Sequence, residues 1–316
     1  MKEHKEVSAL LQQAKQERRC CYGTSDAQRR ALKRRLHAGE LVSPYKNLYA
    51  DRTLWNTMTR EQQSLQVIRA LSAIHPQWVF AGLSAACVYG LQHNYSLHDG
   101  TVHIASKSGI GGDEARLNRI YINRIPTRKH NGILLTTPAR TLLDCAAFPF
   151  PQALPIYDSA LRKSLTTIEE VQSLMIQSVC DEVSVTKLLK YADPLSENGG
   201  ESLMRGQITE LSFGIPLLQV QFMNPDNPAM SYRVDFCWKL ADGRIIVAEY
   251  DGMAKYADIS NKNRASLQAK MEYDRRRDRH LREQGVTEIV HVFYEDLLRP
   301  INLETKLLKA GVPKIR

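Results

Sequence analysis

The chain has 316 residues, which corresponds to about two domains at roughly 150 residues each. Its composition, 43% hydrophobic and 24% charged, excludes a wholly disordered chain, a collagen-like repeat and a mini-protein that depends on disulfides. The 43 Lys and Arg residues outnumber the 34 Asp and Glu residues, and the net charge of +9 favours an anionic partner, nucleic acid first and an anionic membrane surface second.

The first 50 residues carry 11 Lys and Arg against 5 Asp and Glu. A helix is predicted over residues 26–38, with an N-cap within 24–26 and a stop at Gly39. Two short β-like pieces follow within residues 41–49. A helix and then a tight hairpin is the outline of a winged helix, so residues 1–55 are predicted to bind DNA; the alternative is a solvated basic helix near a terminus. The residues expected to contact phosphates are Arg29, Arg30, Lys33 and Arg34.

Residues 56–192 are expected to form a mixed α+β domain. A capping-box pattern, Thr59 with Gln three positions on, opens a predicted helix over 60–75. The stretch 101–145 alternates between apolar and polar residues as strands do. Residues 193–200 combine Pro, Ser, Asn and Gly, which places a domain boundary there.

From Glu201 the predicted order is helix, three strands, helix and strand. The first helix covers 201–213, and its apolar residues share a face with Glu201, so this carboxylate is aimed at the sheet and needs a partner. The alternative for Glu201 is a first-turn acid that the helix dipole stabilises. The strands are expected at 217–222, 231–238 and 244–251, and the following helix, which is strongly basic, at 261–284.

The Ala-Asp-Gly loop that ends at Gly243 leaves two hairpin registers open. A two-residue Asp-Gly turn places Asp235 opposite Tyr250. A three-residue turn, with Gly243 in the left-handed conformation, places Asp235 opposite Glu249 instead. Asp251, two residues after Glu249, then lies on the same face, so the second register clusters three carboxylates near the open end of the hairpin.

Three clustered carboxylates repel one another unless a cation lies among them or protons are taken up. Oxygen ligands suit Mg²⁺ or Mn²⁺, which activates water and neutralises charge on a scissile phosphate. Lys255 follows closely and is a candidate to orient that water or stabilise the phosphate. The basic helix, with Arg275 and Arg276, is suited to track a nucleic-acid backbone. The alternative is a hairpin with solvated edge charges and an amphipathic helix with a polar face.

A series of motifs extends over residues 199–299. They are Gly200-Glu201-Ser202, Gly214-Ile215-Pro216 with Gln219, Arg233-Val234-Asp235-Phe236, Glu249-Tyr250-Asp251-Gly252 with Lys255-Tyr256, Arg277-Asp278-Arg279-His280-Leu281 and Gly285. This segment resembles the restriction-endonuclease-like superfamily, the PD-(D/E)XK nucleases, and within it the small Vsr-like domain of bacterial proteins. The resemblance implies an α-β-β-β-α-β core, Asp235 and Glu249 as metal ligands, and accessory roles for Glu201 and Gln219.

One position departs from the superfamily pattern, because Asp251 stands in place of the usual Lys. Two alternatives follow: Lys255 takes the role of the missing Lys, or the domain binds without cutting. The predicted catalytic residues are Glu201, Asp235, Glu249, Asp251 and Lys255.

The first half carries a second set of motifs. They are Arg30-Ala31-Leu32 through Leu48-Tyr49, Leu83-Ser84-Ala85-Ala86 with Tyr89-Gly90-Leu91, and Thr137-Pro138-Ala139-Arg140-Thr141-Leu142-Leu143-Asp144. About residues 7–175 resemble AbiEi-type antitoxins of type IV toxin–antitoxin systems. The resemblance implies a winged helix that binds DNA and represses its own operon, with a cognate toxin as a further partner.

The sequence therefore predicts an α/β protein, α+β overall, with a winged helix, a mixed middle region and a nuclease-like domain at 199–316. No apolar run reaches the roughly 20 residues of a spanning helix, no apolar signal region follows the N-terminus, and the 6 Cys form no C-x-x-C pair. We expect a cytoplasmic protein with reduced thiols and no membrane partner.

The leading functional hypothesis is a Mg²⁺-dependent or Mn²⁺-dependent endonuclease that hydrolyses DNA. The second is a non-catalytic DNA-binding regulator or antitoxin with a degenerate nuclease fold. The third is a nuclease that acts on RNA.

Overall fold

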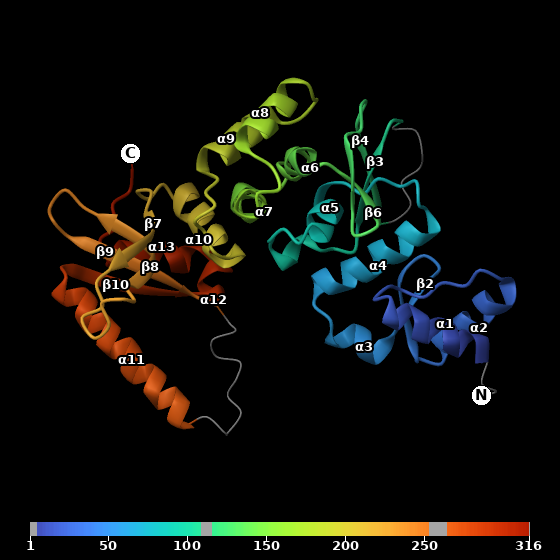
Figure 1. Ribbon diagram of the computed structural model, residues 1–316, viewed down its shortest axis with the longest axis horizontal. Coiled ribbons are helices and arrows are strands. Elements are labelled where there is room, and N and C mark those ends of the chain that lie inside the picture. The colour runs from blue at the N-terminus through green and yellow to red at the C-terminus, as the bar shows by residue number, and fades with distance from the viewer. Residues whose placement is uncertain (1–4, 109–115, 253–263, 316) are drawn as a thin grey trace. The chain divides into compact units, whose positions relative to one another are not determined.

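The structure is a computed structural model that describes residues 5–108, 116–252 and 264–315, without the side chains of 264–271. Figure 1 labels its helices and strands, and the mixed α/β class predicted from the sequence is confirmed. The chain divides into two compact units: Met1–Phe148 with Ser164–Lys190, and Pro149–Lys163 with Tyr191–Arg316. Within the described ranges, no helix has both the length and the apolar character that crossing a membrane requires.

The first unit begins with two helices and a hairpin. Their bounds are α1 (Lys5–Gln16), α2 (Asp26–His37), β1 (Leu41–Tyr45), β2 (Leu48–Asp51) and α3 (Arg52–Thr57). Ser25 caps α2, because its hydroxyl accepts from the Gln28 backbone N–H at 3.3 Å and the Gln28 side chain returns to the backbone of Ser25. Leu32 of α2 is fully buried against α1 and β2, which leaves the other face of α2 to solvent.

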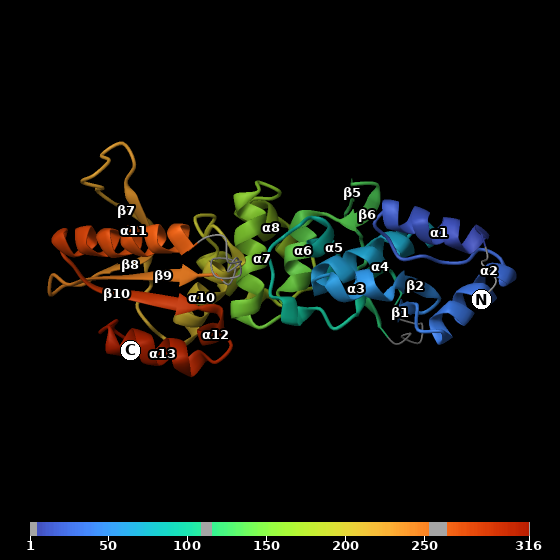
Figure 2. The same ribbon diagram turned by 90° about the horizontal axis from the view of Figure 1, so that it is seen from below.

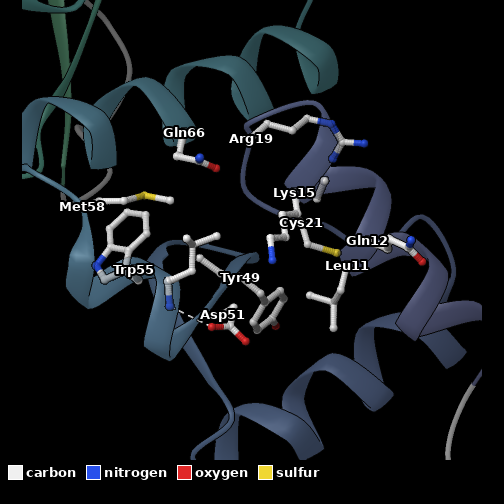
Figure 3. Close-up of a pocket in the computed structure, with 13 residues that line it drawn as sticks. Leu11, Gln12, Lys15, Arg19, Cys21, Tyr49, Asp51, Trp55, Met58 and Gln66 are labelled. Carbon is white, nitrogen blue, oxygen red and sulfur yellow. Dashed lines mark hydrogen bonds between the residues drawn. The ribbon is translucent and has the colours of Figure 1, made fainter.

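A small pocket of about 280 Å³ lies among α1, β2, α3 and the next helix, α4 (Arg60–Ile74). Figure 3 shows Trp55 and Met58 on one side of it and Leu11 on the other. None of its lining residues comes from α2, so the exposed face of α2 is separate from this pocket.

The rest of the first unit surrounds a small sheet. Its elements are α5 (Gly82–Val88), η1 (Tyr95–Leu97), β3 (Val102–Ser106), β4 (Leu117–Tyr121), β5 (Thr127–His130), β6 (Ile133–Thr136), α6 (Pro138–Cys145), α8 (Ile168–Ile176) and α9 (Glu182–Tyr191). The backbone of Phe80 forms bridges to both β3 and β6, so this fully buried residue joins the two strand pairs.

The second unit is built on a four-stranded sheet with the order β10-β9-β8-β7. Its elements are α7 (Phe150–Arg162), α10 (Gly199–Glu210), β7 (Leu217–Phe222), β8 (Tyr232–Lys239), β9 (Ile245–Asp251), α11 (Arg264–Glu283), β10 (Val286–Phe293), α12 (Tyr294–Leu297) and α13 (Pro300–Lys309). Strands β7, β8 and β9 are antiparallel neighbours, whereas β10 runs parallel to β9 after the α11 crossover.

Each face of this sheet has its own apolar core. One core contains Met204 of α10, Phe236 of β8 and Leu303 of α13, and the other contains Val234 of β8 and Leu281 of α11. Figure 2 shows the sheet between α11 and α13. A side chain of this sheet therefore faces either α11 or the pair of helices α10 and α13.

Helix α10 also packs closely against α7. A Cβ added to Gly206 would lie 2.6 Å from the Pro151 Cα. Because this is a backbone atom, a side chain at position 206 would force the two helices apart. This close approach positions the first turn of α10, which carries Glu201.

Candidate functional site

The β8–β9 hairpin adopts one of the two registers that the sequence left open. Phe236 lies opposite Ala248, and Lys239 lies opposite Ile245, which is the register of the three-residue turn. Gly243 has a φ of +89°, as that turn requires. The paired positions end at Phe236 and Ala248, one residue after Asp235 on β8 and one residue before Glu249 on β9.

The strand pair β7–β8 changes its alternation at Asp235. Residues two apart in a regular strand share a face, yet Val234 packs in the α11 core and Phe236 in the α10 core. Gln219, which neighbours Asp235 across the pair, has a φ of +53°, in the left-handed region that a residue with a side chain rarely adopts. Such backbone outliers persist where the surrounding structure fixes them, and they are concentrated at functional sites.

Gln219 joins the two carboxylates that meet at this irregularity. Its side-chain amide donates to Glu201 Oε2 at 3.1 Å and to Asp235 Oδ1 at 3.5 Å. Asp235 Oδ2 accepts from the Tyr250 backbone N–H at 2.8 Å, so the side chain of Asp235 joins β8 to β9. The structure thus brings together three of the residues singled out from the sequence, and the middle one is a strained glutamine.

Glu201 is only 4% exposed and lies in the first turn of α10. The Glu197 backbone N–H donates to Oε2 at 2.7 Å, and the Asn198 side-chain amide donates to Oε1. Burial, and then the charge of Asp235, raise the pKa of Glu201 to about 7, although the hydrogen bond from Glu197 opposes this shift. Glu201 is therefore a carboxyl group that takes up or releases a proton near neutral pH.

Glu201→Gln should flatten the pH dependence of stability. A pKa of about 7 in the folded protein, against 4.5 for the ordinary group, means that the wild type loses stability as the pH rises through this interval. The full shift corresponds to about 3 kcal/mol at most, and the loss is complete above about pH 7. Urea unfolding at about pH 5 and about pH 8 measures it for both proteins.

Glu197→Gln is the matched control, because Glu197 lies four residues away with a half-exposed side chain that pairs with Arg233 at 2.6 Å. This control should keep the wild-type pH dependence. If the free energy of unfolding falls by the same amount from about pH 5 to about pH 8 in the wild type and in Glu201→Gln, Glu201 is not the titrating group.

Glu249 lies on the α11 side of the sheet and is paired with a cation of the protein itself. Arg277 Nη2 donates to Glu249 Oε1 at 2.5 Å and to the Arg233 carbonyl at 2.8 Å. The side chains of Arg277 and Glu249 are 15% and 10% exposed, so most of this ion pair is shielded from water. The charge of Glu249 is neutralised by α11.

Asp251, 9% exposed, has a similar arrangement with β10. His291 Nδ1 lies 2.9 Å from Asp251 Oδ2, and the parallel register places His291 beside Glu249. The hydrogen bond to Asp251 raises the pKa of His291, although burial opposes it, so the pair favours a protonated imidazole.

The binding of Mg²⁺ by Asp235 and Glu249 stays a prediction, and the described contacts of these acids are with protein groups. Asp235 accepts from backbone and amide donors, whereas Glu249 and Asp251 are compensated by Arg277 and His291. Among residues with described positions, these carboxylates belong to no group of three ligand side chains whose ligand atoms all lie within 4.8 Å of one another. Lys255, the remaining predicted catalytic residue, lies outside the described residues.

The predicted phosphate contacts of the first unit lie on α2. Arg30, Lys33 and Arg34 are exposed and, with His37, follow the spacing i, i+3, i+4, i+7, which aligns them on one helix face. Arg29 is different, because its guanidinium donates to Asp26 at 2.9 Å and to the Gly23 carbonyl at 3.3 Å. The exposed basic face of α2, defined as Arg30, Lys33, Arg34 and His37, therefore excludes Arg29.

The predicted contacts on α11 are also exposed. Arg275 and Arg276 lie on its outer surface, and Arg276 forms an ion pair with Asp226 at 3.3 Å. Two residues that the sequence reasoning did not assign to the site are Arg277 and His291. Arg277 stood within a matched motif without a role, and no local signal placed His291 beside the hairpin.

The chain is similar to known proteins, but the names of those proteins state no activity. No family model matches the chain, and no solved structure matches it significantly. Two proteins of Mycobacterium tuberculosis are similar to it: MT2308 of strain CDC 1551 / Oshkosh and Rv2248 of strain ATCC 25618 / H37Rv, both named uncharacterized. Each is 28% identical over 226 residues, which is 68% of this chain and 74% of the relative.

Proposed function

We propose that this chain is a DNA-binding protein of the regulator type. The observation that carries the proposal is the exposed basic face of α2, followed directly by the β1–β2 hairpin. In the described part of the chain, Arg30, Lys33 and Arg34 have no acidic partner, so binding phosphate breaks no ion pair. A capped helix with such a face, next to a hairpin, supports the winged-helix interpretation and contacts to the DNA backbone.

In this proposal the second unit has a nuclease-like fold that binds without cutting. The support is the internal compensation of its acids, Glu249 by Arg277 and Asp251 by His291. A carboxylate that already has a protein cation at 2.5 Å gains less from a divalent ion. The resemblance to AbiEi-type antitoxins agrees with a regulator, and a cognate toxin is then the proposed protein partner.

A Mg²⁺-dependent or Mn²⁺-dependent DNA endonuclease is the second candidate. It is favoured by the Glu201–Gln219–Asp235 group, in which two carboxylates share one amide and Glu201 has a pKa of about 7. This alternative requires Glu249 to leave Arg277. It therefore predicts a rearrangement of α11 that the DNA regulator does not need.

One experiment separates the two candidates. Purified full-length protein is incubated with supercoiled plasmid in Mg²⁺, in Mn²⁺ and in EDTA, and binding to a labelled duplex is measured in the same buffers. The regulator binds in all three and leaves the plasmid intact. Cleavage that EDTA abolishes and Asp235→Asn removes would establish the endonuclease, and no binding in any buffer would contradict both.

Arg277→Gln should create a response to divalent ions that the wild type lacks. The substitution leaves Glu249 largely buried without the cation of Arg277, which destabilises the protein by about 3 kcal/mol. Mn²⁺ should then raise the melting temperature of the variant, because an ion that binds only the folded state stabilises it.

The matched control is Arg276→Gln, since Arg276 is adjacent in sequence but its ion pair is half exposed. This variant should lose less than about 1 kcal/mol of stability, and Mn²⁺ should not raise its melting temperature. A Mn²⁺ shift in the wild type that disappears in Asp235→Asn would instead support the metal site predicted from the sequence.

A further inference from the structure

Three potential metal ligands converge in the first unit, far in sequence from the nuclease-like segment. The ligand atoms of Cys87, His93 and His98 all lie within 4.8 Å of one another. Cys87 is in the last turn of α5, His93 is in the following loop, and His98 directly follows η1. Cys87 and His98 are buried, and His93 is half-buried.

The second nitrogen of each imidazole is held by the protein. His93 Nδ1 lies 2.6 Å from the Leu91 carbonyl, and His98 Nδ1 lies 2.8 Å from Ser64 Oγ on α4. A carbonyl can only accept, so His93 carries its proton on Nδ1 and presents a lone pair at Nε2. Partners of this kind orient histidines that bind metals and fix their tautomer.

The two Nε2 atoms face each other at 2.6 Å. Two nitrogens at this distance share one hydrogen, so His93 Nε2 is a lone pair and His93 is a neutral imidazole, which is the form that binds a metal ion. Without an ion, His98 must place its proton between the two Nε2 atoms and accept from Ser64 through Nδ1.

The surroundings favour a cation at this point. The Glu61 backbone carbonyl, in the first turn of α4, accepts from the Cys87 thiol at 3.7 Å, so an oxygen with partial negative charge lies beside the cluster. A cavity of about 460 Å³ is lined by both Ser64 and His98 and provides a path for entry. One thiolate and two imidazoles form a mixed sulfur and nitrogen set, which suits Zn²⁺ and does not suit Mg²⁺.

We propose that Cys87, His93 and His98 bind a Zn²⁺ ion. The ion joins α5 to the loop of residues 91–98, and Ser64 connects the site to α4. Three protein ligands leave one tetrahedral position for water or a further ligand. Binding requires the Cys87 thiol to lose its proton, whereas His98 only moves its proton from Nε2 to Nδ1, so one proton leaves for each ion bound.

The test uses the full chain, stripped with a chelator and titrated with Co²⁺ and then Zn²⁺. Co²⁺ should bind one ion per chain, with the visible bands of tetrahedral Co²⁺ and a thiolate charge-transfer band in the near ultraviolet, and Zn²⁺ should displace it. Calorimetry in buffers of different ionisation enthalpy should report one proton released per Zn²⁺ near neutral pH.

Two variants and two controls assign the ligands. Ser64→Ala should weaken Zn²⁺ binding by about 10- to 100-fold by freeing the His98 ring, and His93→Gln should weaken it further because a ligand is lost. Cys180→Ser and His75→Gln, which lie outside the cluster, should bind as the wild type does. Cys87→Ser should remove the charge-transfer band. Because Cys87 is buried, this variant can fail to fold, and His93→Gln, at a half-buried position, is then the decisive variant.

Three results would overturn the proposal. They are a wild type that binds no Co²⁺, a complex without the thiolate band, and a His93→Gln variant whose Zn²⁺ affinity equals that of the wild type. In those cases the cluster is a hydrogen-bonded histidine pair beside a buried thiol.

Discussion

Replacing Arg30, Lys33 and Arg34 together by alanine is expected to weaken binding to every DNA duplex tested, by on the order of 100-fold at about 0.1 M salt. The three cations are exposed on one face of α2, so each is available for one phosphate contact. Each lost contact lowers the slope of log affinity against log salt by about 0.9, and the triple variant should lose about 3 units. Fluorescence anisotropy of labelled duplexes over a range of salt concentrations measures both quantities.

The control is a triple variant of identical composition on another surface of the same unit. Arg124, Arg128 and Lys129 are exposed in and before β5, so replacing them by alanine removes the same charge. It should leave the slope near that of the wild type. If the α2 variant keeps the wild-type slope, α2 does not contact DNA, and the exposed arginines of α11 are the next candidates.

The parts of this site that the sequence predicts well depend on local chemistry. The strand at Leu217–Phe222 has the predicted bounds, and the hairpin adopts one of the two registers that the sequence left open, with Gly243 in the left-handed conformation. A turn fixes the positions of the few residues on each side of it, so the sequence limits the residue opposite Asp235 to Tyr250 or Glu249.

The partners of the acids depend on contacts between distant residues. His291 reaches Asp251 only because β10 returns parallel to β9 after the α11 crossover, and the turn of the hairpin carries no information about that register. Arg277 is one of several arginines on α11, and the helix alone does not show which one faces Glu249. The sequence therefore predicts a cluster of acids but not the cations that neutralise it.

A similar limit applies to the alternation of β8. Period-two reasoning assumes a regular strand, whereas the left-handed Gln219 lets the β7–β8 pair change its alternation at Asp235. Glutamine has no intrinsic preference for that conformation, so only the packing around it produces the change. Cys87, His93 and His98 likewise come together through a loop whose path their spacing does not predict.

The largest loss of stability is expected from breaking the buried ion pair that joins α7 to α10, the helix that carries Glu201. Asp158 of α7 accepts from Arg205 Nη2 at 2.5 Å and from the Asp193 backbone N–H at 2.9 Å. Arg205 lies one turn after Glu201 on α10, and the two side chains of the pair are 6% and 0% exposed. Burial raises the pKa of Asp158 even though Arg205 opposes it, which shows how much this carboxylate depends on its cation.

Arg205→Met should lower the free energy of unfolding by about 3–5 kcal/mol near neutral pH, because it leaves the Asp158 charge buried without a cation. Below the raised pKa of Asp158 the variant protonates this carboxyl group, so its deficit should shrink as the pH falls. Urea unfolding near pH 5 and pH 8 (about three units apart) measures both effects.

Two further variants test the cause. Asp158→Asn combined with Arg205→Gln removes both charges and should be more stable than Arg205→Met, because neither partner is left as an unpaired buried ion. Arg244→Met breaks an ion pair of similar length, 2.8 Å to Asp242, whose side chains are about half exposed, and should cost less than about 1 kcal/mol. If Arg205→Met loses as little unfolding free energy as Arg244→Met, water reaches Asp158. The ion pair with α7 would then not hold the first turn of α10, and with it the carboxyl group of Glu201, in place.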